Sequence, residues 1–89
     1  MKGIITVIGK DKVGIIAKVC VFLSDYGVNI LDISQTIVQG YFNMLMIVDM
    51  SAAEKTFEDV SVGLDKLGDE IGVKIKLQNE DIFNAMHRI

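Results

Sequence analysis

Two glycines, Gly9 and Gly14, enclose a charged loop whose residue types let a small ligand approach the backbone. An apolar, β-branched run over residues 4–8 stops at the first glycine, and an apolar helical pattern resumes after the second. The start of such a helix presents unpaired N–H groups that attract a carboxylate. Asp11 either caps this helix through the N–H of Val13 or Gly14, or pairs with the ammonium group of a ligand. The candidate ligand-binding residues of this corner are Gly9, Lys10, Asp11, Val13, Gly14 and Ile15.

Several candidate residues also have a purely structural explanation. Gly9 and Gly14 fit a tight turn and close packing between helix and sheet. Further along the chain, Asn29 is either a turn residue or a polar contact to a ligand held by a neighbouring subunit. Asp32 either keeps the solvent face of its strand polar or faces a second subunit. Together with Ile30, these two residues complete the set of candidate ligand contacts.

The corner must be positioned by one strand and one helix. Residues 2–8 are apolar on both faces, which predicts a central strand. A helix is predicted after Asp11, running to about Tyr26, and Gly27 ends it. Further apolar residues widen its stripe beyond one face, so a partner subunit is the expected second cover. The expected core stripe is Val13, Ile16, Ala17, Cys20 and Leu23, and the widening residues are Ile15, Val19 and Phe22.

The middle of the chain predicts a β-hairpin over residues 28–38 and 41–50, with a tight turn at Gln39-Gly40. In its first strand, Leu31, Ile33 and Ile37 are expected on one face, and the other face has Asp32, Ser34 and Thr36. Its second strand is expected to add a soft core layer. That layer is Phe42, Met44, Met46, Val48 and Met50.

The last third of the chain predicts a helix, an edge strand and a short terminal helix. Ser51 and Glu54 fit a capping box, and Gly72 ends the helix that follows. The strand over residues 73–78 alternates apolar and polar residues, as edge strands do. Asn79 is expected to cap a C-terminal helix over residues 80–89, which must dock on its own domain or on a neighbour. The apolar stripe of the first of these helices is Phe57, Val60, Leu64, Leu67 and Ile71. Its solvent face is Glu58, Asp59, Asp65, Lys66 and Asp69. The apolar stripe of the C-terminal helix is Ile82, Phe83, Met86 and Ile89.

The order strand-helix-strand-strand-helix-strand predicts an α+β fold of the ferredoxin-like kind. Right-handed crossovers place both main helices on one face of a four-stranded antiparallel sheet. The 89 residues, 51% of them hydrophobic, are expected to form one domain over residues 1–89 that includes the C-terminal extension.

Composition and motifs exclude several functions. The net charge of -3 argues against nucleic acid and anionic membranes as partners. Since the chain has neither a basic leader nor an apolar run of roughly 18 residues, we expect a cytoplasmic protein. The single Cys20 cannot form an internal disulfide, and His87 fits a helix-end charge better than a metal ligand. No nucleophile-base pair or P-loop is present, so no catalysis, cofactor or metal is expected.

In two segments, Gly9–Ile16 and Gly27–Ile33, the sequence resembles the ACT domain, a regulatory module that typically binds amino acids. Among ACT proteins it is similar to the small stand-alone kind, related to the glycine cleavage system repressor and to the domain that precedes formyltetrahydrofolate deformylase. The resemblance implies a homodimeric, non-enzymatic module that senses a small amino acid at the subunit boundary. The alternatives are a ligand-independent dimerisation or protein-interaction adaptor, and an enzyme that uses the loop as an oxyanion site.

Overall fold

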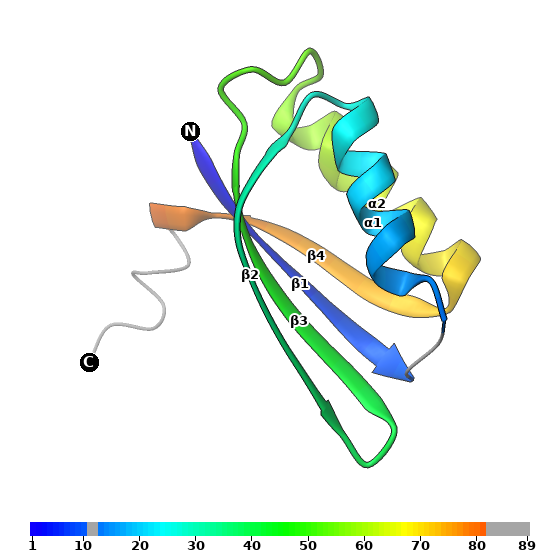
Figure 1. The fold of residues 1–89 in the computed structure, drawn as a ribbon. Helices are drawn as coiled ribbons and strands as arrows, with labels where there is room; N and C mark the ends of the chain where they lie inside the picture. Colours follow the sequence, from blue (N-terminus) through cyan, green and yellow to red (C-terminus); the bar gives the residue numbers. More distant parts are fainter. Residues whose placement is uncertain (11–12, 82–89) are drawn as a thin grey trace.

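The computed structural model of the chain describes residues 1–10 and 13–81. It confirms the predicted order of strands and helices (Figure 1). No third helix is among the elements of this part of the chain, and the predicted stripe of Ile82, Phe83, Met86 and Ile89 lies outside the described residues. The elements are β1 (Lys2–Lys10), α1 (Ile15–Asp25), β2 (Asn29–Val38), β3 (Tyr41–Asp49), α2 (Phe57–Ile71) and β4 (Val73–Asn79).

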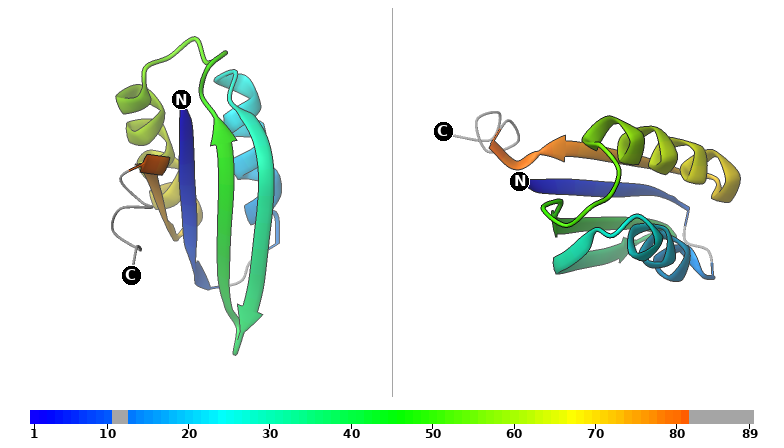
Figure 2. Two further views of the ribbon diagram at one scale, coloured as in Figure 1. Left: turned by 90° about the vertical axis from the view of Figure 1, so that its left-hand side faces the viewer. Right: turned by 90° about the horizontal axis from the view of Figure 1, so that it is seen from above.

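The four strands form one antiparallel sheet in the order β2-β3-β1-β4. Both helices cover the same face of this sheet, and the opposite face carries neither of them (Figures 1 and 2). β1 is a central strand, as its two apolar faces predict, and β2 and β4 are the two edges. The ferredoxin-like arrangement is therefore confirmed.

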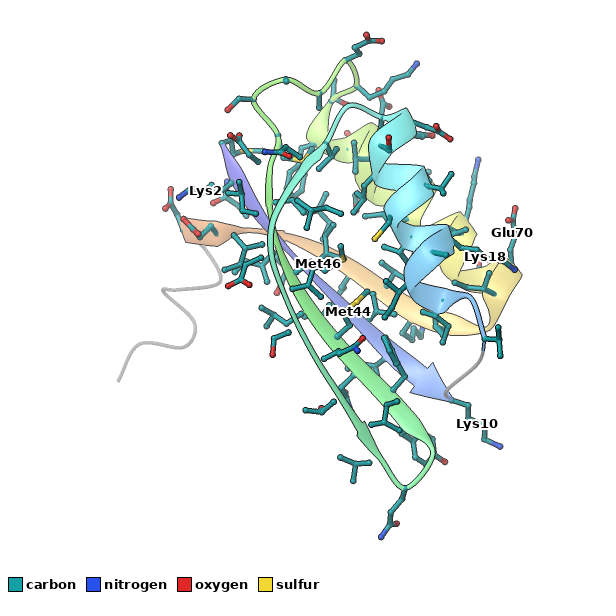
Figure 3. All side chains as sticks on the ribbon, in the orientation of Figure 1. Lys2, Lys10, Lys18, Met44, Met46 and Glu70 are labelled. Atoms are coloured by element: carbon teal, nitrogen blue, oxygen red, sulfur yellow. The ribbon has the colours of Figure 1, made fainter. Side chains whose placement is uncertain are left out.

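The core lies between the sheet and the two helices. The methionine layer of β3 is buried there as predicted, and Met44 and Met46 point from β3 toward the helices (Figure 3). The predicted stripe of α2 is also confirmed, because Val60 and Leu64 are fully buried and its other members pack against the core. Core positions from the remaining elements are Ile5, Val7, Ile15, Val19, Leu23, Ile75 and Leu77.

The predicted start of α1 is wrong, and its predicted core stripe is correct only in part, because Leu23 is buried and Ile16 and Cys20 pack against the core. The helix begins at Ile15 with Gly14 at the N-cap, and Asp11 lies outside the described residues. The buried residues of α1 are Ile15, Val19 and Leu23. These three residues are four positions apart, so they lie on one side of the helix, which faces the sheet. Val13, which precedes the helix, and Ala17 belonged to the predicted stripe, and both are exposed.

The predicted capping box of α2 is also wrong. The helix starts at Phe57, and the side chain of Thr56 caps it by accepting the N–H of Asp59 at 3.1 Å. Ser51 instead donates its hydroxyl to Asp49 Oδ1 at 2.6 Å and its N–H to the same oxygen at 2.9 Å. A serine held in this way has no role at a helix start. The predicted end of α2 is confirmed, with Gly72 in the left-handed region at φ 76°.

The hairpin of β2 and β3 turns at Gln39-Gly40 as predicted. Both residues have positive φ, 49° and 80°, which identifies a two-residue turn of type I′. A bulge between Ile30 and Asp32 leaves Leu31 as an extra residue, so the predicted alternation is correct only after it.

Candidate functional site

Gly9 lies where the end of β1 meets its two neighbouring strands. It pairs with Phe42 on β3 and with Val73 on β4. A Cβ atom added at Gly9 would lie 2.7 Å from Val73 Cγ1 and 3.0 Å from Val73 Cβ. These distances are too short for nonbonded carbon atoms, so the structural explanation of this glycine has direct support in the strand packing.

Gly14 has a different role, because it sets the conformation at the start of α1. Its φ is 89°, a value that side chains disfavour, yet nothing lies within 4 Å of the position that a Cβ would take. The carbonyl of Gly14 accepts the N–H of Lys18 at 3.0 Å. Gly14 has no side chain to cap the helix, and the first turn of α1 carries no acidic residue. The positive end of α1 therefore has no compensating charge in its own first turn.

A hollow of about 450 Å³ lies beside this end of α1. Its volume is in the range of small-molecule sites. Among the described residues that line it, Gln35 is the one with a polar side chain, and neither Gln35 nor Ile37 is among the candidate ligand contacts predicted from the sequence. Both follow from the hairpin register, which places them opposite the buried Met44 and Phe42. The hollow is lined by Gly14, Ile15, Ile16, Ala17, Gln35, Ile37 and Phe42.

Two other candidates of the corner lie apart from this hollow. Lys10 is exposed at the end of β1 and extends away from the fold (Figure 3). Val13 is fully exposed just before the helix. Of the predicted corner residues that the structure describes, Gly14 and Ile15 line the hollow, and Gly9 lies behind it in the sheet.

The second group of candidates is at the opposite end of α1. Asn29 and Ile30 begin β2 and line a separate hollow of about 430 Å³ with Cys20 and Ser24. α1 has 11 residues and is therefore about 16 Å long. The distance between the candidate residues at its two ends is larger than a small amino acid. A single chain does not bring the two groups of predicted residues together (Figure 1).

Asp32 lies on β2, an edge strand of the sheet, and accepts a backbone hydrogen bond there. Its Oδ1 accepts the N–H of Ile33 at 2.9 Å, so this N–H points away from β3. Because backbone groups alternate along a strand, the N–H groups of Gln35 and Ile37 also point away from β3. They face the open edge, which lies beside the hollow.

The two edges of the sheet differ in how they are protected from pairing. β4 presents Lys74 and Lys76 to solvent, a usual protection against edge-to-edge association. β2 contains one charged residue, Asp32, and no lysine or proline. Its exposed apolar residues include Ile37 and Val38, which are 56% and 59% exposed. The edge of β2 is therefore the surface best suited to pair with another strand.

The structure gives little indication of other kinds of site. In residues 1–10 and 13–81, no three His, Cys, Asp or Glu side chains come together as metal ligands. Over the same ranges, no helix is long and apolar enough to cross a membrane.

Comparison with known proteins identifies similar chains along almost the whole length. Residues 3–78 match the family model described as ACT domain. A UPF0237 protein of Bifidobacterium longum is 60% identical over 88 residues, which cover 99% of this chain and 98% of that protein. A UPF0237 protein of Clostridium acetobutylicum is 56% identical over 89 residues, the whole of both chains.

Solved structures agree with these matches. An ACT domain protein from Streptococcus pneumoniae has a TM-score of 0.82 and 42% identity, and the match covers 93% of each chain. A putative glycine cleavage system transcriptional repressor has a TM-score of 0.74 and 23% identity over 86% of this chain and 44% of that one. For a formyltetrahydrofolate deformylase from Pseudomonas syringae the values are 0.79 and 20%, over 88% of this chain and 27% of that one. The last two share the fold, and the similarity that the sequence suggested is confirmed.

Proposed function

Since this chain belongs to the ACT domain family of regulatory ligand-binding modules, we propose that it is a non-enzymatic sensor of a small amino acid. The observation that supports this most directly is the hollow beside the uncompensated start of α1. It joins an apolar wall to one polar side chain, Gln35, and to the N–H groups of a helix N-terminus.

In this proposal the ligand carboxylate accepts hydrogen bonds from the first-turn N–H groups after Gly14. The side-chain carbonyl of Gln35 accepts a hydrogen bond from the ligand ammonium, and Asp11 is a second partner for that ammonium. Ile15 and Ile37 enclose the small side chain of the ligand, and Gly9 and Lys10 form the base of the corner. A hollow of this size favours a small amino acid over a large aromatic one.

We also propose that the working unit is a homodimer paired through β2. A two-fold axis between the two subunits pairs their β2 strands antiparallel to each other. The start of one β2 therefore approaches the end of the other, which lies beside the hollow. In this way Asn29 of the partner subunit, with Ile30 of the partner subunit, completes a site that one chain leaves divided. Asp32 pairs with Ile47, on the sheet face away from the helices, so its place in this proposal is at the edge where the two β2 strands meet.

A thermal-shift screen across the amino acids tests ligand binding. At a free ligand concentration of 100 times Kd, binding adds about 2.7 kcal/mol to the free energy of unfolding. The proposal expects a clear rise in Tm with one or a few small amino acids and none with the large aromatic ones. If no amino acid raises the Tm of the dimer at millimolar concentration, amino-acid sensing is refuted.

Two variants then locate the site by calorimetry. Gln35→Ala removes the polar side chain that the described residues contribute to the hollow, and it is expected to weaken binding by about 1.5–3 kcal/mol, the range for a charge-assisted hydrogen bond. Gln78→Ala on β4, the opposite edge of the sheet, makes the same change of side chain away from the proposed site; it is the matched control and is expected to bind as the parent does. Equal binding by both variants and the parent would move the ligand away from the hollow.

The exposed edge of β2 favours one alternative, a protein-interaction adaptor that pairs with a strand of another protein. The two functions differ in their response to ligand. Sedimentation velocity with and without the amino acid from the screen separates them. A ligand that contacts both subunits shifts a sensor toward the dimer, whereas an adaptor keeps the same assembly state under both conditions.

A further inference from the structure

The helix layer carries a groove between α1 and α2. The groove has a volume of about 640 Å³ and is lined by residues of both helices. Its apolar lining includes Val21, which is 59% exposed, and Leu67 on α2. Lys18 and Glu70 also line it, one from each helix, and both extend away from the sheet (Figure 3). In a single chain, the second side of α1 is therefore open.

Ring packing fixes the distance between the two helices at one end of this groove. A Cβ atom added at Gly63 of α2 would lie 2.5 Å from Phe22 Cζ, so the missing side chain gives the Phe22 ring its place against α2. Phe22 in turn stacks on Tyr26, with ring centroids 4.2 Å apart. Because the groove is already formed by this packing, a partner that enters it has little to reorganise.

Three groove residues form one stripe along α1. Lys18, Val21 and Asp25 are three and four positions apart, so they lie one above the other on the same side of the helix. All three are exposed. The stripe is therefore positive near the start of the helix, apolar in the middle and negative at the end.

Such a stripe is complementary to a reversed copy of itself. When a second α1 runs antiparallel to the first, Lys18 faces Asp25 of the partner subunit, and the apolar middle of one stripe meets the middle of the other. A parallel arrangement would place like charges against each other at both ends. The charge order thus selects both the occupant and its direction.

We propose that this groove is a second self-association surface, on which α1 of another copy lies antiparallel to α1. One such contact is small, because α1 is about 16 Å long and a helix is about 10 Å wide. This footprint is far below the roughly 800 Å² that each partner buries in a stable interface. A single groove contact therefore does not hold two chains together.

The homodimer paired through β2 makes the contact twice, and this inference rests on that proposed homodimer but not on ligand binding. Antiparallel pairing within one continuous sheet keeps the helices of both subunits on the same face, so both grooves open to the same side. Two dimers that meet through their helix layers form two groove contacts, the second at a high effective concentration. The resulting assembly is a tetramer that forms at higher protein concentration than the dimer.

Sedimentation velocity of the full chain at rising concentration tests the charge pairing. Lys18→Glu or Asp25→Lys alone sets like charges opposite each other, and each is expected to weaken the association of dimers at least tenfold. The double variant Lys18→Glu with Asp25→Lys restores opposite charges and is expected to assemble as the parent does. A parent that stays dimeric up to millimolar concentration, single variants that assemble like the parent, or a double variant without rescue would each overturn the proposal.

Disulfide trapping measures the contact directly, even where it is short-lived. In a Cys20→Ala background, Val21→Cys lies at the middle of the stripe, where two copies meet. It is expected to cross-link between chains at least tenfold faster than Val62→Cys, the matched control on α2, which is 49% exposed and does not line the groove. Equal rates at the two positions contradict the antiparallel contact.

Gln35→Pro distinguishes a failure at the groove from a failure at β2. Without β2 pairing each chain makes one groove contact, so cross-linking of Val21→Cys is expected to slow at least tenfold, and an unchanged rate overturns the tetramer. A parent that stays dimeric, and that Gln35→Pro converts into a monomer, overturns the groove contact and supports the β2 homodimer. A Gln35→Pro variant with the assembly state of the parent overturns the β2 homodimer, and this inference with it.

Discussion

The substitution Gly9→Ala separates the packing role of this glycine from a role in ligand binding. A Cβ at this position would lie 2.7 Å, 3.0 Å and 3.1 Å from Val73 Cγ1, Cβ and Cα. Val73 cannot move aside easily, because its side chain is β-branched and its backbone pairs with β1. One extra methyl group therefore forces two paired strands apart at the site.

Overpacking of a well-packed interior costs roughly 1–3 kcal/mol, and we expect Gly9→Ala to fall in this range. For a domain of this size the loss corresponds to a fall in Tm of roughly 5–20 °C. Val73→Ala removes Cγ1, the atom nearest the new methyl group, and keeps Cβ and Cα, so it relieves the closest of the three contacts. On its own, Val73→Ala leaves a cavity that costs about 1–3 kcal/mol. The stability loss of the double variant should therefore be smaller than the sum of the two single losses, by about 1 kcal/mol or more.

Urea denaturation of the parent, both single variants and the double variant measures this coupling. Gly40→Ala is the control: it also introduces a methyl group, but nothing lies within 4 Å of its Cβ position, so its loss should not depend on Val73. A Gly9→Ala variant as stable as the parent, or strictly additive losses, would refute the packing explanation. If the double variant folds but no longer binds the amino acid, Gly9 contacts the ligand as well.

Three further predictions address the helix cap, the acidic turn and the edge strand. Thr56→Ala is expected to cost about 1 kcal/mol in urea denaturation, while Ser51→Ala leaves the helical NMR signals at the start of α2 unchanged; the reverse result would restore the capping box. The pKa of Asp49 is lowered by the hydrogen bond from the Ser51 side chain, and then by that from its backbone N–H. Because the folded pKa lies below the unfolded value, the stabilisation is present at neutral pH and is lost as pH falls below about 4. Ser51→Ala should raise the pKa of Asp49 in an NMR titration, and an unchanged pKa would contradict this cause. Gln35→Pro removes an edge-facing N–H and should yield a folded monomer in sedimentation, whereas Thr36→Pro removes a bond to β3 and should destabilise the fold; a dimeric Gln35→Pro variant would exclude pairing through this edge.

The local elements and most of the core can be predicted from the amino-acid sequence alone. Alternation over residues 42–50 and the three- and four-residue spacing over residues 57–71 predict their buried faces correctly, because these patterns depend on strand and helix geometry alone. Turn chemistry at Gln39-Gly40 and Gly72 is equally local, since each needs a positive φ that few residues accept. The order of elements then predicts the sheet and its helix layer.

Competition between local signals caused the errors at the two helix starts. Ser51 and Thr56 are both good caps, and the Asp49 carboxylate removes the first from the competition. At α1, the apolar residues extend around much of the helix, so periodicity does not single out one face. Contact with the sheet selects Ile15, Val19 and Leu23.

The arrangement of the candidate site depends on strand pairing and helix packing, which no local sequence pattern predicts. Gln35 and Ile37 reach the start of α1 because β2 runs back along the helix and the hairpin register orients them to its side of the sheet. Asn29 and Ile30 follow α1 closely in the sequence, yet the length of the helix separates them from Gly14. Distance along a chain says little about distance across a sheet, because strand pairing joins residues far apart in sequence and a helix separates residues that are near.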